Sequence, residues 1–230
     1  DWQTCLKKLE LVQVLNFATV DEDGAPQVRN ISAIHYEPDA LYFFTARGKE
    51  FCKQLLRDGR VQVSAYTRFK ESIRLSGKAV PVPDSEQKQW RDKIFEEQPY
   101  LENVYPKETK NIGIIFVIKG FSIEYFNLGV NPIFREVYEV GAAAKPKGFV
   151  VGDDCIGCET CVGVCPQRAI DMTDGKAVIR QENCLHCGNC GKVFPDQYAS
   201  RHTQSDPNGE VAVKEGKRRV PFHGSPCKHV

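Results

Sequence analysis

Up to about residue 141, short runs of apolar, β-branched or aromatic residues alternate with turn signals, a pattern that predicts strands. The expected strands are VLNFATV (14–20), QVRNISAIHY (27–36), ALYFFT (40–45), VQVSAYT (61–67), SIRLSGKAV (72–80) and IGIIFVIKGFSIEYF (112–126). The turn Asp21–Gly24 predicts a hairpin between the first two runs, and helical patterns cover 3–13, 50–57 and 84–97. Several antiparallel strands with few helices favour a mainly β barrel or sandwich.

The composition changes at a segment of small and polar residues, Gly141–Gly148. Beyond it the chain is rich in cysteine, glycine and short apolar pieces. We therefore expect a β-rich domain over 1–144, a second domain over 145–213 and a terminal tail over 214–230.

Charge and cysteine placement narrow the class of protein. With 31 basic against 30 acidic residues, nothing favours nucleic acid or an anionic membrane as partner. No apolar run approaches the roughly 20 residues of a membrane span. Seven of the ten cysteines fall between Cys155 and Cys190, as metal ligands do and the bridges of a disulfide framework do not. Reduced thiols, and hence a cytoplasmic location, are expected.

The cysteine-rich segment repeats itself. DDCIGCETCVGVCP (153–166) aligns with ENCLHCGNCGKVFP (182–195) at an offset of 29 residues. The spacing C-x2-C-x2-C-x3-C-P winds one loop around an iron–sulfur cubane and directs its fourth cysteine to the other cluster. Zinc is the alternative, although structural zinc sites normally use two separated C-x-x-C pairs. The repeats favour iron–sulfur.

Residues 153–213 resemble the two-cluster bacterial ferredoxins. The resemblance implies one complete 4Fe–4S site, with the ligands Cys165, Cys184, Cys187 and Cys190. The other site has Cys155, Cys158 and Cys161, and its fourth position falls on Phe194. That cluster is then 3Fe–4S, or a labile 4Fe–4S with an open corner. A further alternative is a substitute ligand, Asp196 or Cys227.

The stretch ALYFFTARGKEFCKQLLRDG places a strand end at Thr45 and a helix start within ARGKE. Arg47 and Lys49 are then cations at a helix N-terminus, where the helix dipole disfavours them unless an anion lies between. The alternatives are an anion site and an exposed turn that tolerates two charges.

Most of residues 8–127 resemble the pyridoxamine 5′-phosphate oxidase-like flavoproteins, which implies an antiparallel split β-barrel that binds FMN at a homodimer interface. The C-terminal domain is then an α+β ferredoxin-like iron–sulfur domain. The resemblance assigns FMN contacts to Arg29, Asn30, Ile31, Ser32, Phe44, Thr45, Arg47, Lys49 and Ser72. Phe126 and Arg135 follow the last expected strand, near the flavin ring. Ile31 and Phe44 also fit ordinary core positions.

Together these features predict an oxidoreductase that passes electrons between iron–sulfur clusters and FMN, to or from a small-molecule substrate or a redox partner protein. The alternative is an electron carrier or redox or iron sensor with no substrate of its own; a third possibility is a barrel that holds haem or no cofactor. No acid–base dyad is evident. His35 lies in a strand pattern and is expected to be structural, whereas His186 lies in a cluster loop and is expected to tune the cluster.

Overall fold

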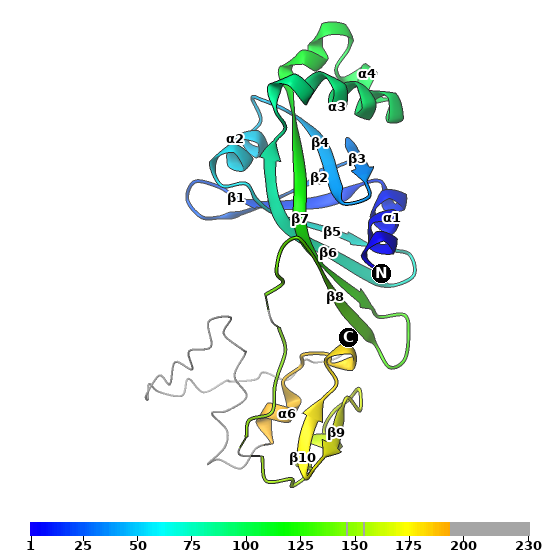
Figure 1. The fold of residues 1–230 in the computed structure, drawn as a ribbon, viewed down its shortest axis with the longest axis vertical. Helices are drawn as coiled ribbons and strands as arrows, with labels where there is room; N and C mark the ends of the chain where they lie inside the picture. The colour runs from blue at the N-terminus through cyan, green and yellow to red at the C-terminus, as the bar shows by residue number, and fades with distance from the viewer. Residues whose placement is uncertain (146, 154, 194–230) are drawn as a thin grey trace, which may run out of the picture.

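The computed structural model describes residues 1–145, 147–153 and 155–193. Figure 1 shows a β-rich part that carries α1 to α4 and β1 to β8, and a smaller part that carries β9, β10 and α6. The expected tail, together with Phe194, Asp196 and Cys227, lies outside the described residues.

Eight strands form one sheet in the order β2-β1-β5-β6-β7-β4-β3, and β8 pairs with β7. All of these pairings are antiparallel. The strands are β1 Leu15–Val20, β2 Pro26–Ile31, β3 Ile34–Glu37, β4 Ala40–Ala46, β5 Arg60–Tyr66, β6 Glu71–Pro81, β7 Gly113–Asn127 and β8 Phe134–Val140. The prediction of a mainly β, antiparallel split barrel is confirmed.

The long strand β7 holds this sheet together. Its first half pairs with β4, its second half pairs with β8, and β6 follows it along nearly its whole length. The change of partner falls at Gly120, whose φ of 72° suits glycine, and β6 is irregular opposite this point, between Gly77 and Ala79. The irregularity bends the sheet and directs β8 toward the smaller part of the molecule (Figure 1).

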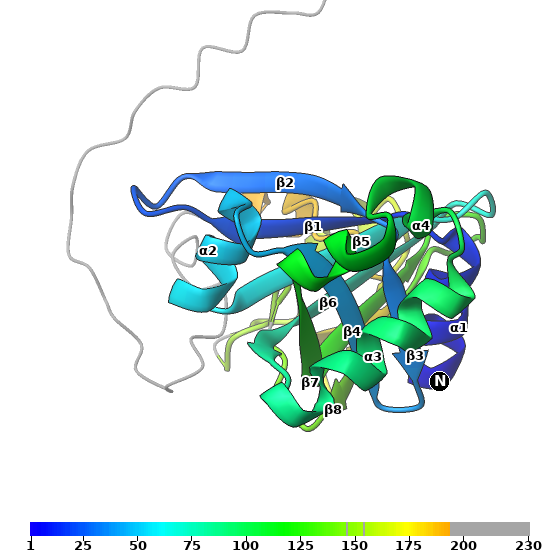
Figure 2. The same cartoon turned by 90° about the horizontal axis from the view of Figure 1, so that it is seen from above.

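The helices close the two faces of the sheet. They are α1 Trp2–Val12, α2 Glu50–Arg57, α3 Asp84–Glu97 and α4 Leu101–Val104, followed by the 3₁₀ segment η1 Lys107–Ile112. The larger core packs α1 and α2 on one side of the strands, around Phe17, Phe43 and Phe116. A second core lies under α3 and α4, where Trp90 stacks on Tyr42 at 3.8 Å. Figure 2 shows α3 running across β3, β4 and β7.

One run that is expected to be a single strand forms two strands. The run 27–36 divides into β2 and β3, which lie at opposite ends of the strand order. The backbone turns at Ser32 and Ala33, where Ile34 N–H donates to Ser32 O and Phe44 N–H donates to Ala33 O. Apolar and β-branched residues continue through this turn, so their pattern alone does not reveal it.

The cysteine-rich part has the repeat that the sequence predicts. Two short helices, α5 Thr160–Gly163 and α6 Asn189–Lys192, are separated by the 29-residue offset. Left-handed backbone recurs at the same offset, at Gly157 and His186 and again at Glu159 and Gly188. Between the helices lie the hairpin of β9 Ile170–Thr173 and β10 Lys176–Ile179 and the 3₁₀ segment η2 Gln181–Asn183. The two halves thus share one loop geometry.

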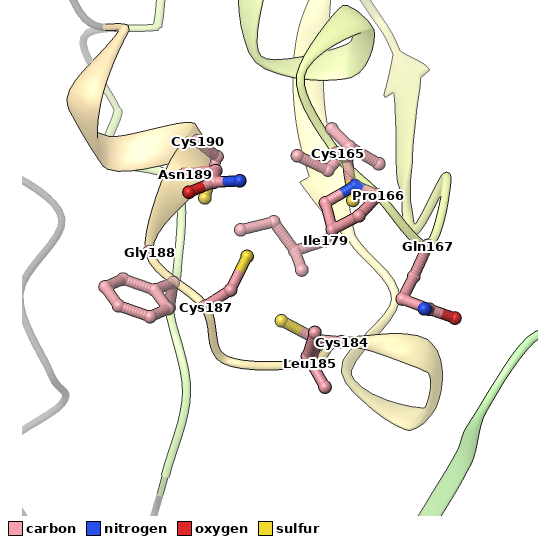
Figure 3. A pocket seen from close by; sticks show the side chains of 12 residues that line it. Cys165, Pro166, Gln167, Ile179, Cys184, Leu185, Cys187, Gly188, Asn189 and Cys190 are labelled. Carbon is pink, nitrogen blue, oxygen red and sulfur yellow. The ribbon is translucent and has the colours of Figure 1, made fainter. Parts of the chain in front are cut away.

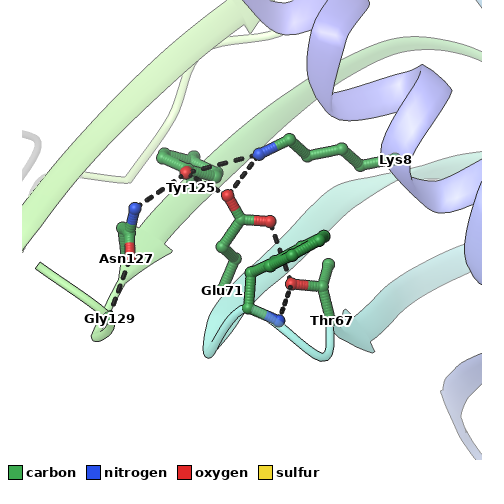
Figure 4. Close-up of polar contacts among 7 residues, drawn as sticks. Lys8, Thr67, Glu71, Tyr125, Asn127 and Gly129 are labelled. Carbon is green, nitrogen blue, oxygen red and sulfur yellow. Dashed lines mark hydrogen bonds and ion pairs between the residues drawn. The ribbon is translucent and has the colours of Figure 1, made fainter.

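A largely buried cluster of polar side chains connects α1 to the strands through an ion pair and hydrogen bonds (Figure 4). Glu71 on β6 forms an ion pair with Lys8 of α1. Tyr125 donates to Glu71 Oε1 at 2.7 Å, and Thr67 donates to Glu71 Oε2 at 2.9 Å. Burial acts to raise the pKa of Glu71, but hydrogen bonds from Lys8, Tyr125 and Thr67 together outweigh it and lower the pKa. The carboxylate is therefore satisfied and has a structural role.

We expect Glu71→Gln to lower the free energy of unfolding at pH 7 by about 1.5–3 kcal/mol, the range for hydrogen bonds to a charged group. A depressed folded pKa stabilises the protein above the unfolded pKa of about 4.3, and this contribution is lost as the pH falls through the folded value. The gap between wild type and variant should therefore close on acidification. Urea unfolding, followed by tryptophan fluorescence, measures it. The exposed Glu22→Gln is the control, and a gap that persists at acid pH would contradict the assignment.

Candidate cofactor sites

Four cysteines from both repeats line one cavity (Figure 3). Cys165 comes from the first repeat, whereas Cys184, Cys187 and Cys190 come from the second. The cavity is small, about 20 Å³, and its walls are largely apolar, including Ile179. These are the four cysteines that the ferredoxin resemblance assigns to the complete cluster, and the fold brings them together.

Backbone amides donate hydrogen bonds to two of these sulfurs. Ala169 N–H donates to Cys165 Sγ at 3.3 Å, and His186 N–H donates to Cys184 Sγ at 3.4 Å. Amide hydrogen bonds of this kind stabilise thiolates and tune the potential of a bound cluster. Burial raises the pKa of Cys184 and Cys190. Deprotonation of these thiols is therefore coupled to arrival of a cation.

The cysteine spacing along the chain favours a cluster over a single metal ion. Within the described residues, no three Cys, His, Asp or Glu side chains converge closely enough to hold one metal ion. A tetrahedral zinc site requires its ligands about 2.3 Å from one centre, whereas a cubane holds each thiolate on a different iron. Four cysteines around one cavity, in the spacing of a ferredoxin, therefore favour a polynuclear cluster.

The three cysteines of the first repeat lie in a matching loop. Cys161 is buried, Cys155 is half-buried and Cys158 is exposed. Ala177 N–H donates to Cys155 Sγ at 3.4 Å, the counterpart of the amide bonds in the other site. Hydrogen bonding from Thr160 lowers the pKa of Cys158. The fourth position, Phe194, lies outside the described residues.

In the barrel, Arg29 is a half-buried cation without an anionic partner among the described residues. Its guanidinium lies 4.5 Å from the ring of Phe51 and donates to Thr19 Oγ1 and to Gln54 Oε1, at 2.5 and 2.8 Å. Burial lowers the pKa of Arg29. A charge withdrawn from water normally has a counter-ion, and this one has only neutral acceptors. The site therefore fits an added anion.

The start of α2 adds to this positive region. Lys49 is the N-cap of α2, and no side chain caps the free N–H groups there. Lys49 Nζ donates only to Tyr105 OH, at 3.2 Å, while Arg47 forms no ion pair within the described part of the chain. Thr45 is buried at the end of β4. An uncapped helix N-terminus with unpaired cations is suited to a phosphate.

The remaining predicted flavin residues are spread over three strands. Asn30 and Ile31 end the edge strand β2, and Ser32, directly after it, contacts Tyr100 OH at 2.5 Å. Phe44 is buried and packs edge-on against Phe95 and Tyr105, so it has a core role. Ser72 lies on β6 opposite Tyr66. Their roles toward a flavin stay predictions.

His35 is buried in the second core. Its Nδ1 lies 2.8 Å from Glu97 and its Nε2 lies 2.9 Å from Glu37, while its ring stacks on Trp90. The contacts with Glu97 and Trp90 join β3 to α3, whereas the contact with Glu37 lies within β3. This is the structural position that the strand pattern predicts.

The structure also shows residues that the sequence pattern does not single out. Gln54 and Thr19 are hydrogen-bond partners of Arg29. Gln54 is a buried polar residue on α2, and that unusual burial is what identifies it once the fold is known. Arg135 stacks on Phe126 at 4.1 Å, where β8 contacts η2 of the cysteine-rich part, and the expected place of both residues near a flavin ring stays a prediction.

Comparisons with known proteins agree with the division of the chain into a β-rich part and a cysteine-rich part. The family model described as pyridoxamine 5′-phosphate oxidase matches residues 3–111, and that of the 4Fe–4S dicluster domain matches residues 148–194. A NimC/NimA family protein from Clostridium acetobutylicum is 21% identical with a TM-score of 0.50, over 60% of this chain and 91% of that structure, and shows the same fold.

Two curated relatives match the cysteine-rich part. The ferredoxin of Pyrobaculum islandicum is 32% identical over 75 residues, 32% of this chain and 68% of that protein. A component of the ion-translocating oxidoreductase complex of Methanosarcina acetivorans is 44% identical over 43 residues, 19% of this chain. The match spans only 16% of that component's length.

The matches show a chain that joins a pyridoxamine 5′-phosphate oxidase-like domain to a 4Fe–4S dicluster domain. Through its cysteine-rich part the chain belongs to the ferredoxin family. No helix within the described residues is long and apolar enough to cross a membrane.

Proposed function

We propose that this protein is a flavin- and iron–sulfur-dependent oxidoreductase that passes electrons between its clusters and FMN, to or from a small-molecule substrate. The observation that carries the proposal is the pairing of two cofactor sites in one chain. Four cysteines surround one cavity, and unpaired cations surround the uncapped start of α2. Bound FMN supplies the exchange between two-electron and one-electron chemistry.

In the proposed FMN site, Arg29, Lys49 and the free N–H groups of α2 hold the phosphate, with Thr45 and Arg47 beside it. Residues 30–32, at the end of β2 and directly after it, together with Phe44 and Ser72, border the flavin. We further propose a cytoplasmic homodimer that contains the flavin at its interface. The proposed domains are 1–144, 145–213 and the tail 214–230, and the two family matches support the first two.

The clusters are proposed as one 4Fe–4S centre on Cys165, Cys184, Cys187 and Cys190, and a 3Fe–4S or labile 4Fe–4S centre on Cys155, Cys158 and Cys161. The absorption spectrum of anaerobically purified protein, with counts of iron, sulfide and flavin, tests the whole assignment. A colourless protein, or one with haem bands, would overturn it.

A second candidate is an electron carrier or a redox or iron sensor. The exposed side of the first cysteine loop favours it, because Cys158 is exposed and Ile156 is 61% exposed. A cluster there is accessible to a partner protein or an oxidant. Oxidation of the reduced flavin by a small molecule alone supports the enzyme, whereas turnover only with a partner protein supports the carrier.

Replacing Lys49 or Arg29 by Ala should weaken FMN binding by about 1.5–3 kcal/mol, the scale of a hydrogen bond to a charged group. Lys49 is exposed, so its loss leaves the fold intact, whereas Arg29 also holds Thr19 and Gln54. Flavin fluorescence on titration of apoprotein with FMN measures the effect. Lys53→Ala, on the exposed side of α2, is the control. Unchanged affinity in both variants would refute the phosphate site.

A further inference from the structure

The loop between β7 and β8 contacts the cysteine-rich part beside the four-cysteine cavity. Ile133 N–H donates to Gln167 Oε1 at 3.2 Å, and Ile133 O accepts from Asn183 Nδ2 at 2.9 Å. Gln167 lines the cavity, and Asn183 directly precedes Cys184. Ile133 itself is buried. The segment directly before Cys184 and the residue two positions after Cys165 therefore both contact the barrel.

Arg135 lies at this junction, two residues beyond Ile133. Its side chain is 10% exposed, its guanidinium stacks on Phe126, and its Nη1 donates to Glu124 at 2.7 Å. Its Nε is buried and has no hydrogen-bond partner among the described residues. The cation is thus withdrawn from water on the barrel side of the cavity.

The charges at the junction do not balance. The buried carboxylate of Glu124 receives three cations: Arg135, Arg74 and Lys147. Burial acts to raise the pKa of Glu124, but the contacts with Lys147, Arg74 and Arg135 outweigh it and lower the pKa, so the carboxylate stays ionised. The side chains of Arg74 and Lys147 are about half exposed, so water screens them. Arg135 remains as the buried positive charge.

This charge lies beside the cluster loop. Arg135 belongs to β8, and β8 contacts η2, which ends at Asn183, directly before Cys184. Arg135 is therefore next to the loop that carries a cluster ligand, without being a ligand itself. Reduction adds one negative charge to a cluster, and a nearby buried cation stabilises the reduced form.

We propose that Arg135 is a positioning residue that raises the reduction potential of the cluster on Cys165, Cys184, Cys187 and Cys190, and so makes this cluster the point of electron exchange with the barrel. The inference rests on the proposed function, in that the four cysteines hold a cluster. Glu124 acts in the opposite sense, by holding a negative charge beside the same cation. No bond is made or broken: one electron enters or leaves the cluster in each step, and the flavin of the barrel is its counterpart.

The test is a redox titration of the whole protein, followed by electron paramagnetic resonance of this cluster. Arg135→Gln removes the cation and should lower the equilibrium constant for reduction about tenfold, which is about 59 mV for a one-electron couple. Glu124→Gln removes the anion and should shift the potential upward. Arg135→Lys retains the charge and should restore most of the wild-type value.

Arg74→Gln is the matched control, because Arg74 binds the same carboxylate but is 46% exposed, and it should shift the potential little. If the role of Arg135 were purely structural, Arg135→Gln and Glu124→Gln would shift the reduction potential in the same direction, because both would weaken the contact between the barrel and the cysteine-rich part. That result, or an unchanged potential in Arg135→Gln, would overturn the inference. Should Arg135→Gln fail to load its cluster, the upward shift of Glu124→Gln decides the question. Failure of the proposed function is seen separately, as wild-type protein without clusters or flavin.

Discussion

Replacing Cys165 by Ala is expected to remove the cluster that Cys184, Cys187 and Cys190 hold, although Cys165 belongs to the other repeat. The structure places its side chain on the wall of the same cavity as these three cysteines. A buried cluster that loses one of four thiolates has an iron open to exchange. The expected loss is about four irons per chain, together with the signal of one 4Fe–4S centre. Iron and sulfide analysis with electron paramagnetic resonance measures both.

The matched control is Cys158→Ala, in the first loop. It should leave the 4Fe–4S signal unchanged and affect only the second centre. Under uncrossed ligation, Cys155, Cys158, Cys161 and Cys165 would hold the complete 4Fe–4S centre, so Cys165→Ala and Cys158→Ala would both abolish its signal. The two variants therefore test the ligand exchange between repeats directly.

Much of the barrel follows from local pattern. The helix predicted over 50–57 is found at Glu50–Arg57, because its buried face (Phe51, Cys52 and Leu55) recurs at helical spacing. The predicted turn at Asp21–Gly24 is also found, with Asp21 Oδ1 accepting the N–H groups of Asp23 and Ala25. In both cases the determining interactions lie within a few residues along the chain.

What sequence reasoning missed depends on contacts between distant segments. β8 is absent from the prediction because much of Phe134–Val140 is exposed and only its pairing with β7 makes it a strand. The position of Arg135 depends in turn on that strand and on the docking of Ile133, so no local pattern reveals its approach to Cys184. The division of β2 from β3 likewise depends on two separate pairing partners.

The cofactor sites divide in the same way. The spacing of the cysteines along the chain determines how each loop can surround a cluster, so the sequence alone predicts which cysteines line the cavity. The phosphate site is less explicit in the sequence, because Arg29 and Lys49 are 20 residues apart and only the fold shows that neither has an anionic partner among the described residues. The structure adds that Arg29 is half-buried against the neutral Gln54, and this burial is a physical reason to expect a bound anion.

The structural repeat also indicates which ligand position Phe194 occupies. The helices α5 and α6 and the left-handed positions before them all keep the 29-residue offset as far as Lys192. Cys165, shifted by this offset, falls on position 194. Since Cys165 reaches across to the second loop, its equivalent is the expected fourth ligand for Cys155, Cys158 and Cys161. Phenylalanine has no atom that binds iron, so that centre is expected to be 3Fe–4S, labile or empty.

We therefore expect Phe194→Cys to convert this centre into a stable 4Fe–4S cluster and to bring the chelator-resistant iron to about eight per chain. Val193→Cys, which displaces the new thiol by one residue, is the control and should add no stable iron. Iron retained after incubation with a chelator, together with the electron paramagnetic resonance signal of a 3Fe–4S centre before and after substitution, measures the change. If the unmodified protein already holds about eight chelator-resistant irons, and keeps them in Cys227→Ala and Asp196→Ala, another ligand completes the site. The substitution at position 194 then has no effect on the cluster, and the ligand has to be sought elsewhere in the chain or in a partner.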